Sequence, residues 1–417
     1  MRGLIGHPLG HSFSKLIHEK INQKEYQLLD YTKEEVEELL KSKIFHALNV
    51  TIPYKHDVIE YLDKLDSISR ITKTVNTIVN KDGKLVGYNT DYFGLKYLLK
   101  HHQVNLQNKN VLILGTGATS NTVYKVCKDL KANKISKVSR RKQPHCFTYE
   151  EVLNNQTLLN NVHIIINTTP VGMYPNVDEQ VMSIKDFKNL TAVIDVVYNP
   201  YKTNLLLEAK EAGIKYVGGL MMLVAQAVYA VELFDDLELS FNDKKSLINT
   251  IYKDLLLKKV NIVLIGMPGS GKSTMGKLLS TELKMNFYDL DYAFQYKYKK
   301  SPSDVINTLG VEEFRKMETE VAKEYSKLEN SIIATGGGIV TIDENYDYFK
   351  HNSIIIYLER KPSEKTLERN RPLSNNIETW ENLYNERHHL YMKWKDYKVD
   401  SSIKKTDTLK KILNCIK

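Results

Sequence analysis

Residues 261–273 read NIVLIGMPGSGKS, a short apolar run that leads into a glycine-rich loop. The run has the length and β-branched composition of a strand buried in a parallel sheet. The loop, GMPGSGKS at 266–273, fits the pattern GxxxxGK[ST], which joins a strand to a helix around a phosphate. Backbone amides of Gly269, Ser270 and Gly271 surround that phosphate, and the helix start adds partial positive charge. The C-terminal part of the chain is therefore predicted to bind a nucleoside triphosphate.

The side chains around this loop predict ATP and Mg²⁺ as its ligands. Lys272 reaches the β- and γ-phosphate oxygens, the Ser273 hydroxyl is a ligand of Mg²⁺, and Thr274 belongs to the same nucleotide-binding turn. Further along, FYDLD at 287–291 places Asp289 and Asp291 two residues apart at a strand end. Both carboxylates can then face the same cleft.

A second strand–glycine–helix unit is NVLILG at 110–115, continued by GTGATS at 115–120. This imperfect GxGxxG predicts a dinucleotide site, in which the turn contacts the pyrophosphate. The residues of this turn that are predicted to bind the cofactor are Gly115, Thr116, Gly117, Ala118 and Thr119.

The next predicted strand, 134–140, decides which dinucleotide is bound. It ends in Ser139, Arg140 and Arg141, where an NAD enzyme would carry Asp or Glu for the ribose 2′-hydroxyl. A basic pair at this position suits a 2′-phosphate. We therefore expect NADP(H).

The remaining pattern predicts an α/β protein with three domains. Apolar runs at 162–170 and 191–199 alternate with helical stretches, which is typical of a parallel sheet. Strand candidates at 1–6, 44–52 and 75–80 form an earlier α/β region, and 222–257 is helical in period. The predicted domains are an α/β substrate domain at 1–100, completed by helices near 222–255; a Rossmann NADP-binding domain at 101–256; and a P-loop α/β/α domain with a parallel sheet at 257–417.

Composition places further bounds on function. The 59 basic and 50 acidic residues give a formal net charge of +9, but lysines are scattered and often stand beside glutamates. This pattern indicates a solvated surface that favours anionic small substrates, and it does not favour nucleic-acid binding. Three distant cysteines, no membrane-length apolar run and no leader lead us to expect a cytoplasmic protein without a membrane partner.

Several motifs of the C-terminal part share one order and spacing: FYDLD (287–291), GVEEFRKME (310–318), GGG (336–338), RPL (371–373) and RHHLY (387–391). With the phosphate loop, they resemble shikimate kinase over 260–404. The resemblance implies that shikimate is bound by Asp291, Arg315, Gly337 and Arg387, as suits a carboxylate with three hydroxyls. It makes Asp291 the residue that orients the attacking hydroxyl, Asp289 the magnesium-side aspartate, Glu318 a partner of the Arg315 region, and Arg371 the lid arginine that closes on ATP.

The N-terminal motifs are also in a family order: GHPLGHSFS (6–14), NVTIPYK (49–55), VNT (75–77), NTD (89–91), NTTP (167–170), DVVYNP (195–200) and GLMMLVAQ (219–226). Residues 1–250 thereby resemble shikimate dehydrogenase. The resemblance assigns the substrate carboxylate to Ser12 and Ser14, and the ring hydroxyls to Thr51, Asn76, Asp91 and Gln226. It places Tyr198 beside the substrate, and Val196 and Gly219 at the nicotinamide.

Lys55 and Asp91 resemble the family's catalytic pair. Reduction of a ring ketone needs a hydride from the nicotinamide and a proton at the carbonyl oxygen. A lysine held by a carboxylate can deliver that proton.

The chain departs from both family patterns at a few positions. The kinase differences are Val311 in place of Glu, a short lid around Arg369, and Lys404 as a weak ATP contact. The dehydrogenase differences are Lys15 in place of Pro, residues 72–74 in place of small residues, Ala118 in place of the third glycine, and Ser139 in place of Asn.

Together the two resemblances predict a bifunctional enzyme of aromatic amino acid biosynthesis. The N-terminal part would reduce 3-dehydroshikimate with NADPH, and the C-terminal part would phosphorylate the resulting shikimate. Two alternatives remain at this stage: a quinate or quinate/shikimate dehydrogenase fused to the kinase, and an N-terminal domain that senses shikimate without turnover. A sensor would be expected to lose Lys55 or Asp91, whereas this chain has both.

Overall fold

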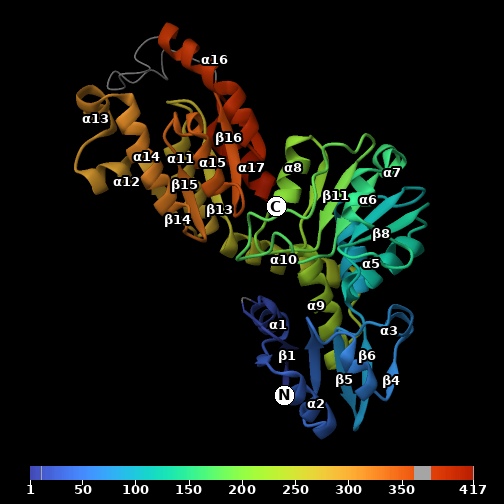
Figure 1. The fold of residues 1–417 in the computed structure, drawn as a ribbon. Helices are drawn as coiled ribbons and strands as arrows, with labels where there is room; N and C mark the ends of the chain where they lie inside the picture. The colour runs from blue at the N-terminus through green and yellow to red at the C-terminus, as the bar shows by residue number, and fades with distance from the viewer. Residues whose placement is uncertain (11, 361–376, 417) are drawn as a thin grey trace. The chain divides into compact units, whose positions relative to one another are not determined.

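The computed structural model describes residues 1–10, 12–360 and 377–416 (Figure 1). It divides into two compact units, Met1–Leu255 and Leu256–Lys417. Within the described residues, no helix combines the length and the apolar character that a membrane crossing requires.

The first sheet lies in the N-terminal unit and has the strand order β2-β1-β3-β5-β6-β4. Its strands are β1 (Arg2–Gly6), β2 (Gln27–Asp30), β3 (Ala47–Val50), β4 (Lys64–Leu65), β5 (Thr77–Lys81) and β6 (Lys84–Tyr88). Its helices are α1 (Ser14–Asn22), α2 (Lys33–Ser42), the 3₁₀ turn η1 (Asp57–Tyr61), α3 (Ser67–Thr72) and α4 (Asp91–His101). Strand β1 is parallel to β3, and β5 is antiparallel to both β3 and β6. The ends of β1, β3 and β6 therefore share one edge with the start of β5.

The second sheet is entirely parallel and has the order β12-β11-β10-β7-β8-β9. Its strands are β7 (Val111–Leu114), β8 (Ile135–Ser139), β9 (Cys146–Thr148), β10 (Ile164–Asn167), β11 (Ala192–Asp195) and β12 (Lys215–Val217). Its helices are α5 (Ala118–Asp129), α6 (Tyr149–Leu153), α7 (Gln156–Asn161) and α8 (Asn204–Glu211). The order reverses beside β7, which is where a doubly wound sheet binds its ligand.

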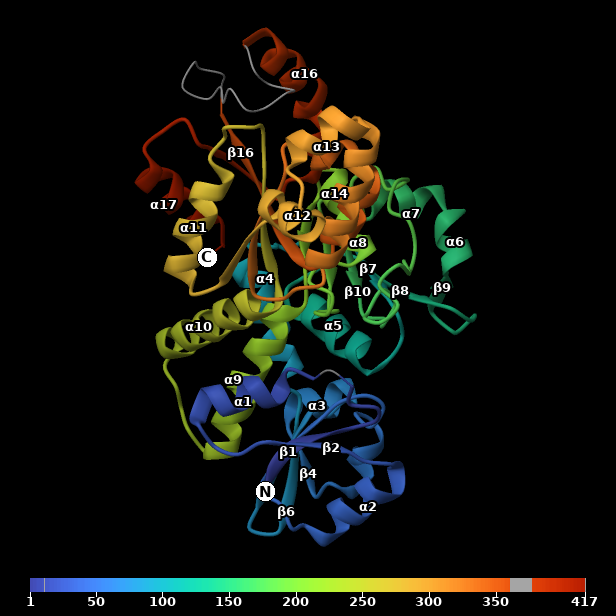
Figure 2. The same ribbon diagram turned by 90° about the vertical axis from the view of Figure 1, so that its left-hand side faces the viewer.

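The helical stretch predicted at 222–257 is two helices, α9 (Leu220–Asp235) and α10 (Phe241–Lys259). The break follows from Asp236, which caps α9 in the left-handed region at φ 49°. Helix α9 is apolar on most of its surface and returns to the first sheet, where Phe234 packs with Leu4 and Tyr26 (Figures 1 and 2). The first sheet is thus completed by a segment more than a hundred residues beyond β6.

The C-terminal unit is built on a third, wholly parallel sheet with the order β14-β15-β13-β16-β17. Its strands are β13 (Asn261–Ile265), β14 (Asn286–Asp289), β15 (Ser331–Ala334), β16 (Ser353–Glu359) and β17 (Tyr397–Asp400). Its helices are α11 (Lys272–Leu283), α12 (Leu290–Tyr298), α13 (Pro302–Leu309), α14 (Val311–Tyr325), η2 (Ile339–Thr341), α15 (Asp343–Phe349), α16 (Ile377–Trp394) and α17 (Lys405–Ile416). The predicted α/β fold class, with a P-loop domain at the C-terminal end, is confirmed.

A buried carboxyl group holds the ends of β10 and β11 together in the second sheet. Asp195 is fully buried and accepts hydrogen bonds from Asn167 Nδ2 at 3.0 Å, the Val197 amide at 3.0 Å and Thr203 Oγ1 at 2.7 Å. Burial raises the pKa of Asp195 to about 7, although the three hydrogen bonds oppose this shift. The folded protein therefore binds a proton here that the unfolded chain releases near the ordinary aspartate pKa.

This difference predicts how stability depends on pH. Because the folded pKa is raised, the contribution of Asp195 is complete below about pH 4 and is lost as the pH rises to about 7. The free energy of unfolding of the wild type, minus that of Asp195→Asn, should fall over this interval by up to about 1.4 kcal/mol per pH unit. Hydrogen exchange at the amides of β11 measures this difference at each pH. The exposed Asp178→Asn is the control, and a difference that stays constant with pH for Asp195→Asn would contradict the interpretation.

Candidate functional sites

The first candidate site lies at the shared edge of the first sheet. Lys55 follows β3, Asn76 precedes β5, and Asp91 follows β6 as the first residue of α4. Lys55 Nζ lies 2.6 Å from Asp91 Oδ2, and the two side chains are only 13% and 9% exposed. A lysine and an aspartate from segments 36 residues apart thus form one largely buried ion pair.

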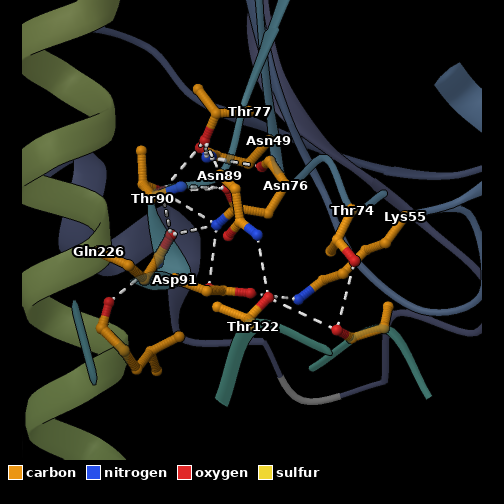
Figure 3. A network of polar contacts seen from close by, with 12 residues as sticks. Asn49, Lys55, Thr74, Asn76, Thr77, Asn89, Thr90, Asp91, Thr122 and Gln226 are labelled. Atoms are coloured by element: carbon orange, nitrogen blue, oxygen red, sulfur yellow. Dashed lines mark hydrogen bonds and ion pairs between the residues drawn. The ribbon is translucent and has the colours of Figure 1, made fainter. Parts of the chain in front are cut away.

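The buried amide of Asn76 organises the polar groups around this pair (Figure 3). Asn76 Nδ2 lies 3.0 Å from Asp91 Oδ1, 2.9 Å from Thr90 Oγ1 and 3.2 Å from Gln226 Oε1. Asn76 Oδ1 accepts a hydrogen bond from the Thr90 amide at 2.7 Å. Since Gln226 comes from α9, the network joins the sheet edge to the returning helix. The prediction missed Thr90, although it stands inside the NTD motif.

The other predicted substrate residues lie around the same edge. Ser12 and Ser14 occupy the segment between β1 and the first turn of α1, and the Ser14 amide donates to Ser12 Oγ at 3.2 Å. Thr51 directly follows β3 and its amide donates to the Ile5 carbonyl at 2.9 Å. Within the described residues, no hydrogen bond joins these serines to the Lys55–Asp91 pair. The ring of Tyr198 lies 5.4 Å, between centroids, from that of Phe13, which stands between the two serines.

The predicted dinucleotide loop lies at the carboxyl edge of the second sheet. Gly115, Thr116 and Gly117 connect β7 to α5, and Ala118 and Thr119 form its first turn. At the same edge, a Cβ added to Gly219 would stand 2.1 Å from the Val196 carbonyl oxygen, so only glycine fits there. The structure thus brings the two predicted nicotinamide residues, Val196 and Gly219, into direct contact.

Two hydrogen bonds join the edges of the first and second sheets. Thr74 Oγ1 donates to the Ala118 carbonyl at 3.3 Å, and Asn89 Nδ2 donates to Thr122 Oγ1 at 2.9 Å (Figure 3). Asn89 Nδ2 also donates to Thr72 Oγ1 at 3.0 Å, a bond between segments of the first sheet. Thr72 and Thr74 belong to the segment that departs from the family pattern. These hydroxyls therefore link the substrate residues to the first turns of the dinucleotide helix.

The basic pair at the end of β8 is available to a ligand. Ser139 is buried and its Oγ accepts from the Arg141 amide at 3.4 Å, whereas Arg140 and Arg141 are exposed. Neither arginine forms an ion pair with a carboxylate in the part of the chain that the structure describes. The neighbouring Lys142, by contrast, is ion-paired with Glu151.

The second candidate site surrounds the phosphate loop of the C-terminal unit. Gly271 is the N-cap of α11, and Lys272 turns back so that its Nζ donates to the carbonyls of Gly266 at 2.8 Å and Met267 at 3.1 Å. The buried Ser270 hydroxyl has no partner within the described residues. A buried cation and an unsatisfied hydroxyl in one loop suit an anionic ligand.

Oxygen donors converge beside this loop. Ser273 Oγ donates to Asp289 Oδ2 at 2.5 Å, and Asp289 Oδ1 accepts from the Asp291 amide at 3.0 Å. A hydroxyl and a carboxylate are hard ligands of the kind that Mg²⁺ prefers, with phosphate and water oxygens completing its shell. Ser273 and Asp289 therefore fit a magnesium ion held jointly with a nucleotide. Across the described ranges, no three His, Cys, Asp or Glu side chains gather as a metal cage.

The predicted shikimate residues come together around the triple glycine. Arg315 and Glu318 form a nearly buried ion pair on α14. A Cβ on Gly338 would overlap the Arg315 guanidinium, and one on Gly336 would meet Glu318 Oε1 and, at 3.2 Å, Asp291 Oδ1. The absence of side chains at this turn lets the charged groups approach the backbone closely.

Arg387 adds a second guanidinium, and its electrostatics suit an acid ligand. It is 5% exposed, and its Nε has no hydrogen-bond partner within the described residues. Burial lowers the pKa of Arg387, and the charge of Arg315 acts in the same direction. Burial likewise raises the pKa of Glu318, against the effect of Arg315. Two arginines beside one carboxyl group leave an excess of positive charge, which a bound carboxylate would neutralise.

Two further contacts lie beside this site, and one predicted residue falls outside the described part of the chain. Tyr391 Oη donates to the carbonyl of Gly337, the predicted shikimate contact. Arg360, which no motif indicated, donates to the Gly269 carbonyl at 3.3 Å. Arg369 and Arg371 lie outside the described residues, so the predicted lid arginine stays a prediction.

Comparisons with known proteins agree with this geometry. The family model described as the shikimate dehydrogenase substrate binding domain matches residues 4–78, and the one described as shikimate kinase matches residues 268–417. A shikimate dehydrogenase (NADP(+)) from Clostridium perfringens is 38% identical over 267 residues, which are 61% of this chain and 97% of that protein.

Solved structures give the same result for the N-terminal part. Shikimate dehydrogenase 1 from Peptoclostridium difficile is 32% identical with a TM-score of 0.56, and the match covers 61% of this chain and 97% of that one. A chorismate mutase/shikimate 5-dehydrogenase fusion protein from Clostridium acetobutylicum is also 32% identical, with a TM-score of 0.55 and coverage of 61% and 96%. Both resemblances found in the sequence are confirmed: the chain belongs to the shikimate dehydrogenase family and carries a shikimate kinase domain at its C-terminal end.

Proposed function

We propose that this chain catalyses two consecutive reactions: reduction of 3-dehydroshikimate to shikimate with NADPH, and phosphorylation of that shikimate at its 3-hydroxyl with MgATP. The observation that carries the first reaction is the largely buried Lys55–Asp91 pair, 2.6 Å apart. The relative from C. perfringens bears NADP(+) in its name, which supports the choice of dinucleotide.

In the reduction, Lys55 acts as the proton donor. When bound, NADPH would supply a hydride to the ring ketone. Lys55 Nζ gives a proton to the carbonyl oxygen as it becomes a hydroxyl. Asp91 holds the ammonium group in place and accepts a hydrogen bond from a neighbouring ring hydroxyl. Asn76 and Gln226 fix Asp91 and the remaining hydroxyls, while Ser12 and Ser14 donate to the carboxylate.

In the phosphorylation, Asp291 orients the 3-hydroxyl toward the nucleotide. Arg315 and Arg387 bind the shikimate carboxylate, and Gly337 supplies a backbone contact. Lys272 stabilises the negative charge on the transferred phosphoryl group. Magnesium held by Ser273 and Asp289 would neutralise phosphate charge when bound.

A quinate dehydrogenase and a non-catalytic sensor are the competing proposals. Quinate carries an added hydroxyl beside its carboxylate, and the paired serines favour the less substituted acid. Steady-state rates with shikimate and quinate separate a shikimate dehydrogenase from a quinate dehydrogenase, since a preference for quinate would refute our assignment. A sensor would bind shikimate without reducing NADP⁺.

A coupled assay tests the two reactions and their independence. With 3-dehydroshikimate, NADPH and MgATP supplied, the wild type should form shikimate 3-phosphate. Lys55→Ala should lower the rate of NADPH oxidation by roughly 10²–10⁴-fold, because it removes the proton donor, and leave kinase activity on added shikimate unchanged. Lys272→Ala should do the converse. Lys64→Ala, an exposed lysine of the first sheet, is the control; joint loss of both activities in Lys55→Ala would contradict separate sites.

Dinucleotide choice is predicted to rest on Arg140. One charge-assisted contact to the 2′-phosphate contributes about 1.5–3 kcal/mol, so Arg140→Ala should lower kcat/KM for NADPH by roughly ten- to a hundredfold. The value for NADH should change little. Lys142→Ala removes an adjacent cation already paired with Glu151 and is the matched control. An equal loss with both dinucleotides would show that Arg140 does not read the 2′-phosphate.

The kinase site predicts a split between kinetic constants. Arg387→Lys loses the planar fork for a carboxylate, so KM for shikimate should rise roughly ten- to a hundredfold while KM for ATP stays within about twofold. His389→Gln, an exposed change on the same helix, should leave both constants unchanged. If KM for ATP rises as strongly as KM for shikimate, Arg387 does not bind the acceptor.

A further inference from the structure

A cavity of ≈ 570 Å³ lies in the N-terminal unit, apart from the residues proposed for the dehydrogenase reaction. Its walls come from α4, the end of α5, the loop that follows α4, α9 and the first residue of α10. A volume of this size is within the usual range for small-molecule sites, about 300–1,000 Å³. None of the predicted substrate or dinucleotide residues lines it.

Aromatic rings form much of its wall. Phe93 of α4 stacks on Tyr229 of α9 with 5.1 Å between ring centroids. Phe93 and Phe241 are 38% and 52% exposed, and Tyr97 also faces the cavity. Large aromatic faces that remain open to water are suited to stack on another planar ring.

Lysines supply the charge of the cavity. Lys96 and Lys100 stand one turn apart on α4, and Lys131 follows α5. Lys100 Nζ lies 4.4 Å from the centroid of the Phe241 ring. No carboxylate of the described residues forms an ion pair with any of these three lysines.

Among the described residues that line the cavity, the carboxylate is Asp129, and it already has hydrogen-bond partners. Asp129 accepts from Lys125 Nζ at 2.5 and 2.7 Å and from Tyr92 Oη at 2.6 Å. The cavity therefore keeps an excess of positive charge beside its aromatic surface. Either feature alone is common on protein surfaces, and their combination around one open pocket selects a particular ligand chemistry.

We propose that this cavity binds an aromatic carboxylate. Its ring stacks against Tyr229, Phe93 and Phe241, and its acid group pairs with Lys96 and Lys100. The site is separate from the reaction centre, because neither Asp91 nor any other proposed substrate or dinucleotide residue lines it, although Phe93 is only two residues from Asp91 on α4. Lys100 lies nine residues beyond Asp91, about 14 Å along the helix. The proposal does not depend on either proposed reaction.

Three probes of matched size separate ring stacking from charge. These are 2-naphthoate, decahydro-2-naphthoate, which has the charge without the aromatic face, and 2-naphthalenemethanol, which has the face without the charge. Binding is measured by isothermal titration to the full chain saturated with shikimate and NADPH, which cannot react with each other, so that the reaction sites stay filled. We expect 2-naphthoate to bind at least tenfold more tightly than the other two.

Variants then assign the binding to this cavity. Lys100→Gln removes one cation and Phe241→Leu one exposed ring, and each should weaken 2-naphthoate about tenfold. Lys188→Gln, an exposed lysine elsewhere in the same unit, should have no effect. Dehydrogenase rates of all three variants report whether each is folded.

Four results would overturn the proposal, of which three concern the binding titrations. They are equal binding of the three probes, unchanged binding in both Lys100→Gln and Phe241→Leu, and 2-naphthoate binding that occurs in the free chain but is lost once shikimate and NADPH fill the reaction sites. A fourth is the absence of naphthoate binding together with a sedimentation coefficient that falls in Phe241→Leu. That result would assign the aromatic surface to a contact between copies of the chain.

Discussion

In a parallel sheet every strand ends at the same edge, and the loops that leave this edge must share a small volume. The second and third sheets are parallel and follow this constraint directly, and the first, mixed sheet brings its loops to one edge in another way. In the second and third sheets the glycine loops follow the strands β7 and β13, so that helix N-termini point across the edge. In the first sheet the antiparallel pair β5–β6 is placed so that Asn76, before β5, and Asp91, after β6, meet the Lys55 loop that follows β3.

Buried amides beside carboxylates then fix these loops. Asn76 contacts Asp91 in the first sheet, and Asn167 contacts Asp195 in the second. A buried polar group that lost its partner would cost about 1–3 kcal/mol, so each member of such a network holds the others in one arrangement. The two networks differ in outcome. Lys55 reaches Asp91 and forms the ion pair proposed to be catalytic, whereas Asp195 accepts hydrogen bonds from neutral donors and holds the strand ends together.

Sequence reasoning succeeded where function depends on a local pattern. The loops at 115–120 and 266–273 each combine a strand, glycines and a helix start within a few residues, so their place in the fold was predictable. The break at Asp236 was not, because a left-handed aspartate leaves no strong mark in an otherwise helical period. The contacts of Thr74 with Ala118 and of Asn89 with Thr122 were also out of reach, since they join segments 33 or more residues apart. The cavity beside α4 depends likewise on the packing of distant helices.

The two sites proposed to bind the carboxylate of shikimate differ in a way that bears on the order of the reactions. In the proposed function, serine hydroxyls hold the acid group of shikimate in the N-terminal unit, while the guanidinium groups of Arg315 and Arg387 hold it in the C-terminal unit. Hydrogen bonds from ionised donors are roughly twice as strong as those between neutral groups. Neutral donors at the first site favour release of the product, and buried cations at the second favour its capture. Joining both sites on one chain raises the local concentration of the second site around the released product. The difference in donor chemistry then favours transfer of shikimate from the first proposed site to the second.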